Sequence, residues 1–409
     1  MDGNQHFGAT VAYVVNMVSG RPQAAPARAA RPAFKALFVS PWARRLGGAE
    51  IILWSLLRHM DRERIRPAVV FFEPGPFVDE VRSLGISATV VPASRLRRPR
   101  ETVGAMRAVA AAIRAQRPDV VVNWSAKAHL YGAPACLAVR PRPLMVWWQQ
   151  MAPDGHWMDR LATALPADAV GVYSSVAGRS QGRLWPARDT FVVHPGTEDP
   201  GVVDAGARAR AREALGIVPG RRVLTIVGRL QPWKGQDRFI EAIATLCRKG
   251  MDVQGIVVGG AAFGLSVDYA KSLAPLANRL GIADRILFSG QVDDVSGYLR
   301  ASDLLVNASE LEPFGMVLLE AMAHGVAVLA VDGGGPSDIV SHGVDGLLAR
   351  SGSVEDLVRC LDDVVGDEER IRQLGRAGRA RFIEAFTCGA SADRVIEELQ
   401  SRLPMKSIR

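Results

Sequence analysis

The chain has 409 residues, of which 48% are hydrophobic, and its formal net charge at pH 7 is +8. This length is sufficient for two domains of ordinary size and argues against a single domain. The positive charge comes mainly from arginine, which is compatible with an anionic ligand, an anionic membrane surface or solvated basic loops. We exclude nucleic acid as a partner, because no aromatic residues interleave with the basic cluster at 95–100 and no nucleic-acid-binding module is recognisable.

Residues 1–33 are predicted to form a disordered N-terminal extension, because residues 20–33 consist largely of Ala, Pro and Arg. The apolar segment 11–18 is too short to span a bilayer and lacks a basic leader, so we expect neither a signal nor an anchor. The cysteines show neither paired-ligand spacing nor a dense disulfide pattern: Cys136, Cys247, Cys360 and Cys388. We therefore expect a reducing, cytoplasmic location without structural zinc.

Short apolar runs alternate with helical patterns in the first half of the folded chain. The expected strands are residues 36–40, 68–72, 88–91, 120–123, 144–147, 170–173 and 191–194. This alternation is typical of a parallel sheet covered on both faces. A linker containing one amphipathic segment follows at 197–220.

A second series of strands is expected at residues 223–227, 254–258, 286–289, 304–307 and 326–330. The predicted fold class is therefore α/β, with two doubly wound parallel-sheet domains at 34–200 and 201–385. Ligands of such sheets bind outside the carboxyl ends of the strands, so we expect the two domains to share one interdomain cleft.

Glycine marks the first strand-to-helix connection, where Gly47 and Gly48 precede a helical pattern at 51–60. The pair either allows a phosphate or sugar to approach the backbone or forms an ordinary turn. There is no G-x-G-x-x-G sequence here, which argues against a dinucleotide oxidoreductase.

Two cations follow the first strand of the second domain within one loop, Arg229 and Lys234. At the carboxyl end of a strand both could grip a diphosphate, Arg through forked donors and Lys as a point charge. The alternative is a solvated pair.

The most informative stretch runs from Glu312 to Glu320, with a Pro/Gly turn at its start and a helical pattern over 314–324. A helix beginning here leaves free N–H groups at Gly315, Met316 and Val317, which attract phosphate oxygens. Glu320 lies about two turns into the helix and can still reach the same pocket.

These motifs, in this order, resemble the retaining glycosyltransferases of family 4. The resemblance is carried by Gly228-Arg229 with Lys234-Gly235, residues 312–315 with 320–325, Gly333-Gly334-Gly335-Pro-Ser-Asp338 and residues 345–348. It is strong over 222–350, looser over 35–197, and absent from 1–33. It implies a GT-B fold, with two Rossmann-like domains and a nucleotide-sugar donor held mainly by the second. It also implies that a C-terminal helix at 386–409 crosses back to the first, acceptor-side domain.

The resemblance implies specific roles for donor-site residues. Arg229 and Lys234 would hold the diphosphate, Glu320 the ribose, and Glu312 the hydroxyls of the transferred sugar. The remaining donor-binding positions are Gly48, Gln291, Val292, Phe314, Gly315, Met316 and Val317. Among these, Gly48 would contact the phosphates from across the cleft, and Gln291 and Val292 would read the base through the backbone.

His129 is the candidate histidine on the catalytic side, because it follows the strand at 120–123 and matches a family histidine. His156 and His194 are weaker candidates for the cleft. His324 is expected at a helix C-terminus, where it interacts with the helix dipole.

Two departures from the family pattern concern the acceptor side and the glycine-rich loop. Trp147-Trp148-Gln149-Gln150 stands where many relatives have a histidine, and Asp338 replaces a commoner glutamate. The tryptophans are either sugar-stacking platforms or buried strand residues.

The residues and the resemblance together predict a metal-independent hexosyltransferase that acts on a nucleotide diphosphate sugar and an acceptor hydroxyl. The resemblance implies that this enzyme is retaining, so that the configuration at the anomeric carbon is kept. No cofactor other than this substrate is expected. The acceptor can be a glycan, a lipid-linked glycan or a small molecule, so contact with the inner membrane face and a role in bacterial polysaccharide biosynthesis are compatible. An epimerase or hydrolase of the same architecture and a non-catalytic sugar-nucleotide-binding protein are the alternatives. The donor base, sugar and acceptor stay open.

Overall fold

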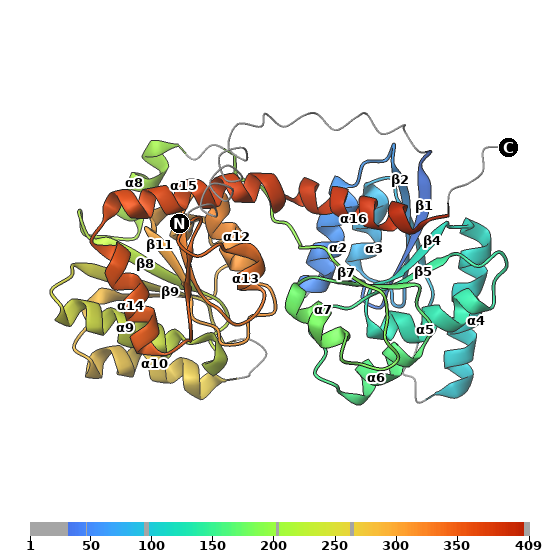
Figure 1. Ribbon diagram of the computed structural model, residues 1–409, viewed down its shortest axis with the longest axis horizontal. Helices are drawn as coiled ribbons and strands as arrows, with labels where there is room; N and C mark the ends of the chain where they lie inside the picture. The colour runs from blue at the N-terminus through green and yellow to red at the C-terminus, as the bar shows by residue number, and fades with distance from the viewer. Residues whose placement is uncertain (1–31, 46, 94–97, 202–203, 262–265, 405–409) are drawn as a thin grey trace, which may run out of the picture.

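The computed structural model describes residues 32–404 except 46, 94–97, 202–203 and 262–265. The predicted disordered extension at 1–33 therefore lies outside the described residues, apart from its last two. The chain forms two α/β lobes that lie side by side, with the N-terminal half in one and the C-terminal half in the other (Figure 1). The predicted fold class is confirmed.

A seven-stranded parallel sheet forms the first lobe, in the order β3-β2-β1-β4-β5-β6-β7. Its strands are β1 Phe34–Ser40, β2 Ile65–Phe71, β3 Ser87–Val90, β4 Val120–Asn123, β5 Leu144–Trp148, β6 Ala169–Val172 and β7 Thr190–Val192. All four residues of β4 and β6 are buried, as expected where helices cover both faces of a sheet. The predicted strands of this half are confirmed.

The second lobe contains a six-stranded parallel sheet in the order β10-β9-β8-β11-β12-β13. Its strands are β8 Arg222–Val227, β9 Val253–Val258, β10 Ile286–Gly290, β11 Leu304–Asn307, β12 Ala327–Val331 and β13 Leu347–Ala349. The sequence did not predict β13. Three residues are too few to show a periodic pattern of their own, and pairing with β12 is what makes them a strand.

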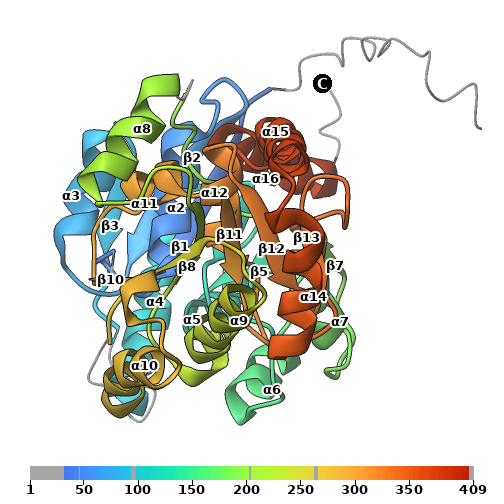
Figure 2. The same cartoon turned by 90° about the vertical axis from the view of Figure 1, so that its left-hand side faces the viewer.

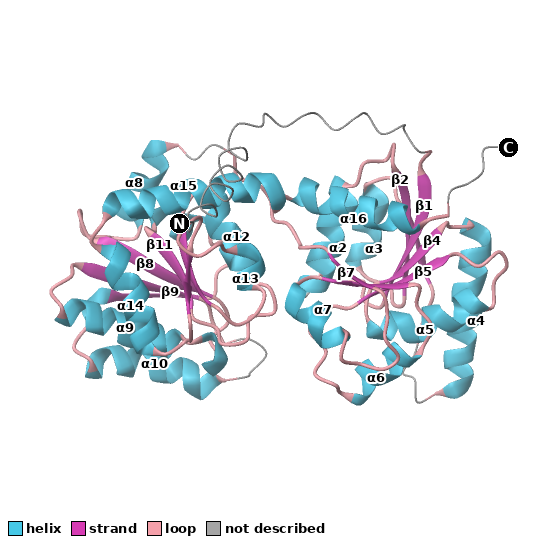
Figure 3. Cartoon of the chain, in the orientation of Figure 1, coloured by secondary structure: helices cyan, strands magenta, loops and turns pink. Residues whose placement is uncertain are grey.

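Helices cover both faces of each sheet (Figure 3). In the first lobe they are α2 Gly48–His59, α3 Pro76–Ser83, α4 Pro99–Gln116, α5 Ala126–Leu137, α6 Trp157–Ala164 and α7 Ser175–Gln181. From the linker onward they are α8 Ala205–Ala214, α9 Gln236–Arg248, α10 Val267–Arg279, α11 Ser296–Ala301, α12 Met316–Ala323, α13 Pro336–Ile339, α14 Val354–Val365, α15 Glu368–Ala385 and α16 Cys388–Arg402. Short 3-10 turns, η1 Pro232–Lys234 and η2 Ala283–Arg285, complete the set in the described residues.

Two consecutive helices join the lobes along one edge. α15 packs on α12 and β12 of the second lobe. α16 then buries Val395, Ile396 and Leu399 in the core of the first lobe and packs on α2. Figure 2 shows α15 and α16 together at one edge of the molecule. Within the described residues, the chain therefore passes between the lobes twice, after β7 and again between α15 and α16.

The cores of the two lobes are apolar clusters on the two faces of each sheet. Within the described residues, no helix combines the length and apolarity that crossing a membrane requires.

Candidate functional site

A cleft of about 1410 Å³ opens between the lobes, at the carboxyl ends of both parallel sheets. Loops after β1, β4, β5 and β6 line it from the first lobe. The loops after β8 and β11, together with the start of α12, line it from the second. This is where doubly wound sheets bind ligands. It brings together most of the predicted donor-site residues: Gly48, Arg229, Lys234, Glu312, Phe314, Gly315, Met316, Val317 and Glu320.

An ion pair between Lys234 and Glu312 lies at the centre of the second lobe's half. The Lys234 Nζ atom is 2.6 Å from Glu312 Oε2, and the Asn307 amide also donates to that oxygen at 3.4 Å. The side chains are only 16% and 10% exposed. Lys234 Nζ also lies 4.2 Å from the centre of the Trp233 ring. A cation and a carboxylate are thus held, little solvated, in a cleft large enough for a substrate.

Arg229 extends the positive charge toward solvent. It follows β8 directly after Gly228, whose φ of 152° is rarely adopted by residues with a side chain. Its carbonyl accepts a hydrogen bond of 3.0 Å from Gln236, which fixes the backbone, while its side chain is exposed. Arg229 can therefore reach a diphosphate without first leaving a buried partner.

The EPFG loop, residues 312–315, ends in a left-handed glycine that starts α12. Gly315 has a φ of 106°, and a Cβ there would also approach Leu318 to 3.0 Å. The Leu318 N–H donates to the Gly315 carbonyl at 2.9 Å and closes the first turn of α12. The N–H groups of Met316 and Val317 precede it in this turn, where N–H groups have no partner within the helix. Both residues line the cleft. A phosphate or sugar oxygen is a suitable partner for these N–H groups.

The Gly-rich loop, residues 333–335, packs directly beneath the EPFG loop. A Cβ on Gly334 would lie 2.3 Å from the Glu312 carbonyl oxygen, and one on Gly335 would lie 2.1 Å from the Phe314 Cα. The Gly335 N–H donates to the Glu312 carbonyl at 2.9 Å. Glycine is therefore required here for close backbone contact, and the Gly-rich loop sets the position of Glu312.

Glu320 lies on α12 and lines the same cleft as Glu312. Burial raises the pKa of its carboxyl to about 7, and the negative charge of Asp294 adds to the shift. The carboxyl group is thus divided between its neutral and charged forms at neutral pH. Hydroxyl donors from a ligand would favour the charged form.

Across the cleft, the glycine turn of the first lobe is held by Glu50. The Gly47 N–H donates to Glu50 Oε2 at 2.9 Å, and α2 begins at Gly48. Burial raises the pKa of Glu50, which the Gly47 hydrogen bond partly offsets. A Cβ on Gly48 would meet nothing within 4 Å, so open space remains beside this backbone.

Exposed apolar side chains line the first lobe's half of the cleft. Trp42, Met151, Trp157 and Met158 are 40%, 68%, 59% and 37% exposed. These residues come from two separate loops and the start of α6 and share no spacing, so no sequence pattern predicts that they lie together. Their only signal was their place after predicted strands.

Trp147 and Trp148 are fully buried. Trp148 stacks on Trp124 with ring centres 5.1 Å apart, and Trp147 stacks on His129 at 5.2 Å. The interpretation of these residues as buried strand residues is confirmed, and the sugar-stacking alternative is wrong.

The structure corrects the placement of His129. The side chain is fully buried, it is not among the residues that line the cleft, and the Asn123 amide donates to its Nδ1 at 3.2 Å. Burial lowers its pKa to about 3. The start of α5 lines the cleft through Ala126 and Lys127, but the His129 ring lies on its buried side and packs against Trp147. Its expected catalytic role has no basis in this arrangement.

Gln291 and Val292 follow β10, at the edge of the sheet, and do not line the cleft described here. Their expected contact with the base stays a prediction. His156 is exposed and caps α6 through its backbone and ring. His324 ends α12 as expected, with its ring on the Glu320 carbonyl at 2.9 Å, and burial lowers its pKa.

Contacts made by His194 and Asp338 also connect the lobes. The His194 ring stacks on Phe314 with centres 5.5 Å apart and an angle of 17°. Asp338 accepts a hydrogen bond of 2.6 Å from the Ser175 N–H at the start of α7. The His194 contact thus links the EPFG loop to the first lobe, and the Asp338 contact links α13, which follows the Gly-rich loop, to the start of α7.

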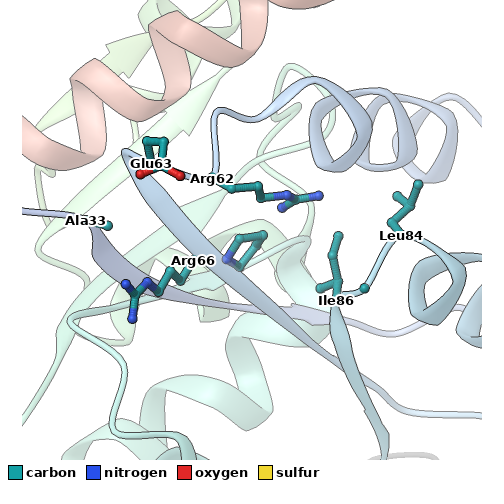
Figure 4. Close-up of a pocket in the computed structure, with 8 residues that line it drawn as sticks. Ala33, Arg62, Glu63, Arg66, Leu84 and Ile86 are labelled. Carbon is teal, nitrogen blue, oxygen red and sulfur yellow. The ribbon is translucent and has the colours of Figure 1, made fainter.

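A second cavity, of about 500 Å³, lies at the opposite edge of the first sheet (Figure 4). It is lined by residues at the amino ends of β2 and β3, including Arg62, Glu63, Arg66 and Ile86. This position is remote from the loops that carry the glycines and the ion pair, so it is not part of the candidate site.

Family models match both lobes. The model of glycosyl transferases group 1 matches residues 207–381, and that of glycosyltransferase family 4 matches residues 46–198. A D-inositol 3-phosphate glycosyltransferase of Nocardia farcinica is 34% identical over 220 residues, which are 53% of this chain and 48% of that protein. The lipopolysaccharide core biosynthesis mannosyltransferase LpsB of Rhizobium meliloti is 32% identical over 183 residues, 44% of this chain and 51% of that protein. The chain thus spans about half the length of these curated relatives.

Solved structures match nearly the whole chain. Anabaena Alr3699/HepE in complex with UDP has a TM-score of 0.76 and 26% identity, covering 90% of this chain and 100% of that one. Its complex with UDP-glucose gives a TM-score of 0.72. The order of the motifs, the two facing sheets and the family models agree, and the chain belongs to the family 4, group 1 glycosyltransferases with a GT-B fold.

Proposed function

We propose that this protein transfers a hexose-type sugar from a nucleotide diphosphate sugar to an acceptor hydroxyl, with retention of configuration at the anomeric carbon. The observation that carries the proposal is the Lys234–Glu312 pair beside the free N–H groups of α12, in the cleft between two lobes. In such a site the cation can bind a diphosphate, and the adjacent carboxylate can accept hydrogen bonds from sugar hydroxyls.

Lys234 and Arg229 would stabilise the departing nucleotide diphosphate. Negative charge grows on the phosphate oxygen as the glycosidic bond breaks, and fixed cations in a poorly solvated cleft interact with that charge more strongly than in water. We therefore propose that the reaction needs no divalent metal. Activity that persists in the presence of EDTA would support this part.

In the proposed step, the acceptor oxygen approaches the anomeric carbon on the face from which the phosphate leaves. The bond from this carbon to the phosphate oxygen breaks, the bond to the acceptor oxygen forms, and the acceptor proton passes to the departing phosphate. Glu312 would orient the sugar hydroxyls, and Glu320 those of the ribose. The buried position of His129 supports a step without a histidine base.

The partners follow from the two halves of the cleft. UDP and UDP-glucose are bound by the Anabaena protein, which makes uridine diphosphate sugars the first donors to test. The exposed Trp42, Trp157 and Met158 favour an acceptor with a substantial apolar face, such as a pyranose ring or a lipid-linked glycan. A cytoplasmic location, with acceptors at the inner membrane face, is part of the proposal.

The test is a matrix of UDP-, GDP- and ADP-sugars with and without candidate acceptors, followed by product analysis. We expect at least one nucleoside diphosphate to raise the melting temperature and one donor to be consumed only when an acceptor is present, giving a product of retained configuration. Donor consumption without an acceptor would instead indicate a hydrolase or epimerase. The absence of binding by any of the nucleotides would contradict the donor site itself.

A further inference from the structure

Three potential metal ligands meet where the chain crosses between the lobes, away from the cleft. His59 ends α2, Glu198 follows β7, and Cys388 begins α16. The His59 and Cys388 ligand atoms and a Glu198 carboxylate oxygen all lie within 4.8 Å of one another. None of the three residues lines the cleft. A side-chain cluster of nitrogen, oxygen and sulfur thus joins segments that are far apart in the sequence.

The His59 ring is oriented as a ligand. Its Nδ1 lies 2.9 Å from the Ser55 carbonyl oxygen, which can only accept, so Nδ1 carries the proton. The lone pair of Nε2 then faces Glu198 Oε2 at 3.5 Å. Two acceptors that face each other need a cation between them, either a second ring proton or a metal. Metal-binding histidines commonly donate their other N–H to a carbonyl in this way.

The sulfur ligand of Cys388 determines which metal ions the cluster would bind well. The Cys388 side chain is 4% exposed, and its Sγ atom lies within 4.8 Å of the histidine nitrogen and the carboxylate oxygen of the cluster. A sulfur ligand favours an ion with a high affinity for thiolate. Calcium and magnesium prefer oxygen ligands, whereas Zn²⁺ accepts sulfur, imidazole and carboxylate together in a tetrahedral set. A water would complete the fourth position.

Arg58 limits the negative charge of the cluster. Its guanidinium lies 3.2 Å from Glu198 Oε1, with 46% of its side chain exposed. This contact uses the oxygen on the other side of the carboxylate from the one that faces His59, so Oε2 keeps a lone pair for a metal. The arginine weakens the attraction for a cation but also fixes the orientation of Glu198.

The backbone holds the crossing segments, residues 195–199 and 386–388, together. Thr197 and Thr387 form a parallel bridge, with hydrogen bonds from the Thr197 N–H to the Phe386 carbonyl at 3.0 Å and from the Cys388 N–H to the Thr197 carbonyl at 3.1 Å. Two of the three ligands are therefore already placed relative to each other, and α2 supplies the third. A site whose ligands are positioned in advance loses less conformational entropy on binding.

We propose that His59, Glu198 and Cys388 bind one Zn²⁺ ion, which ties α2 to both crossing segments and stiffens the junction between the lobes. This site is structural and does not depend on the proposed transfer reaction. The expectation of no structural zinc rested on the spacing of the cysteines along the chain. That spacing does not reveal ligands at 59, 198 and 388, which only the crossing brings together.

The direct test is titration of the full, metal-free protein with Co²⁺, followed by competition with Zn²⁺. We expect one equivalent to bind with a thiolate-to-cobalt absorption band, and Zn²⁺ to abolish the band and raise the melting temperature. Cys388→Ser should remove the band, while Glu198→Gln and His59→Gln should weaken binding at least about tenfold. Cys247→Ser, which alters a half-buried cysteine outside the cluster, is the matched control and should behave like the wild type.

A band that survives in Cys388→Ser, or equal affinities of the wild type and Glu198→Gln, would overturn the proposal. The absence of stoichiometric binding would do so as well, and would leave His59 and Glu198 as a simple ion pair. Glu198 is exposed, so its variant is expected to fold even if the buried Cys388→Ser variant does not. Donor-induced melting shifts, measured separately, keep failure of this site distinct from failure of the proposed function.

Discussion

The two halves of the cleft are built in different ways. The donor half, in the second lobe, consists of backbone held at close range: Gly315 at a positive φ, and Gly335 in contact with Phe314. The first lobe's half carries exposed side chains such as Trp157 and Met151 on loops. Under the proposed function, the first arrangement would hold the diphosphate that all nucleotide diphosphate sugars share. The second can change with the acceptor, since exposed loop residues tolerate substitution.

If this contrast is correct, substitutions in the donor half should affect binding and chemistry with every acceptor. Substitutions in the other half should change the KM for the acceptor and leave donor affinity unchanged.

Lys234→Ala should have the largest effect. It removes positive charge from the departing phosphate and leaves Glu312 buried without its 2.6 Å partner. We expect kcat to fall by about 10²–10³-fold, the range seen when one group that stabilises transition-state charge is lost. Initial rates with saturating donor would measure this, with Lys234→Arg as a control that keeps the charge. A loss of less than about fivefold would mean that Lys234 does not contact the leaving group.

Gly335→Ala tests the support beneath the EPFG loop. The new methyl group would lie 2.1 Å from the Phe314 Cα, so the loop must move. We expect a loss of about 1–3 kcal/mol in the free energy of unfolding and weak or absent donor binding. Gly366→Ala is the matched control, because its φ is −78° and nothing lies within 4 Å of the added carbon. Normal donor affinity in Gly335→Ala would show that the Gly-rich loop does not position Glu312.

Glu320→Gln tests the ribose contact through pH. The carboxyl pKa of about 7 is raised, so the charged form that accepts hydroxyl donors is lost as pH falls below 7. We expect wild-type donor affinity to fall from pH 8 to pH 6, and the variant to bind about tenfold more weakly at pH 8, with little pH dependence and the same sugar preference. Calorimetric titration at several pH values measures both.

Glu320→Gln should also change how the free energy of unfolding depends on pH. A carboxyl with a raised pKa contributes stability below its unfolded pKa, and this contribution is lost as pH rises through about 7. The variant should therefore melt at a higher temperature than the wild type at pH 8, with a smaller difference toward pH 5. If the melting temperatures of the two proteins depended on pH in the same way, the pKa of the Glu320 carboxyl would not be raised.

Trp157→Ala should have the smallest effect. It tests whether the first lobe's half of the cleft contributes to acceptor binding without contributing to donor binding. Its ring is 59% exposed, so stability should hardly change. We expect the KM for the acceptor to rise about 3- to 10-fold, from the loss of an aromatic contact, while donor affinity is unchanged. Trp185→Ala is the control, because Trp185 is 85% exposed and does not line the cleft. A change in donor affinity would show that Trp157 also contributes to donor binding.

The fold and much of the donor half were predictable because their signals are local. Apolar runs gave the strands, and Lys234, Glu312 and Gly315 each occupy a position defined by a turn at a strand end. His129 was misplaced because the direction of its side chain depends on packing against Trp147, which is coded elsewhere in the chain. The Trp42 and Trp157 surface was missed for the same reason: distant loops assemble it.

The interlobe contacts were equally inaccessible from the sequence. Asp338 was recognised only as a departure from the family pattern, yet it accepts a hydrogen bond from Ser175 across the junction. Contacts between residues so far apart in the chain leave no periodicity to read.

The most direct test of the account is a comparison of UDP, GDP and ADP binding to the wild type and to Lys234→Ala by calorimetry, combined with product analysis for the best donor. We expect one nucleoside diphosphate to bind the wild type with one-to-one stoichiometry and to bind the variant much more weakly. We also expect its sugar to be transferred to an acceptor with retained configuration. Equal binding to both proteins, or a product of inverted configuration, would contradict the proposed function.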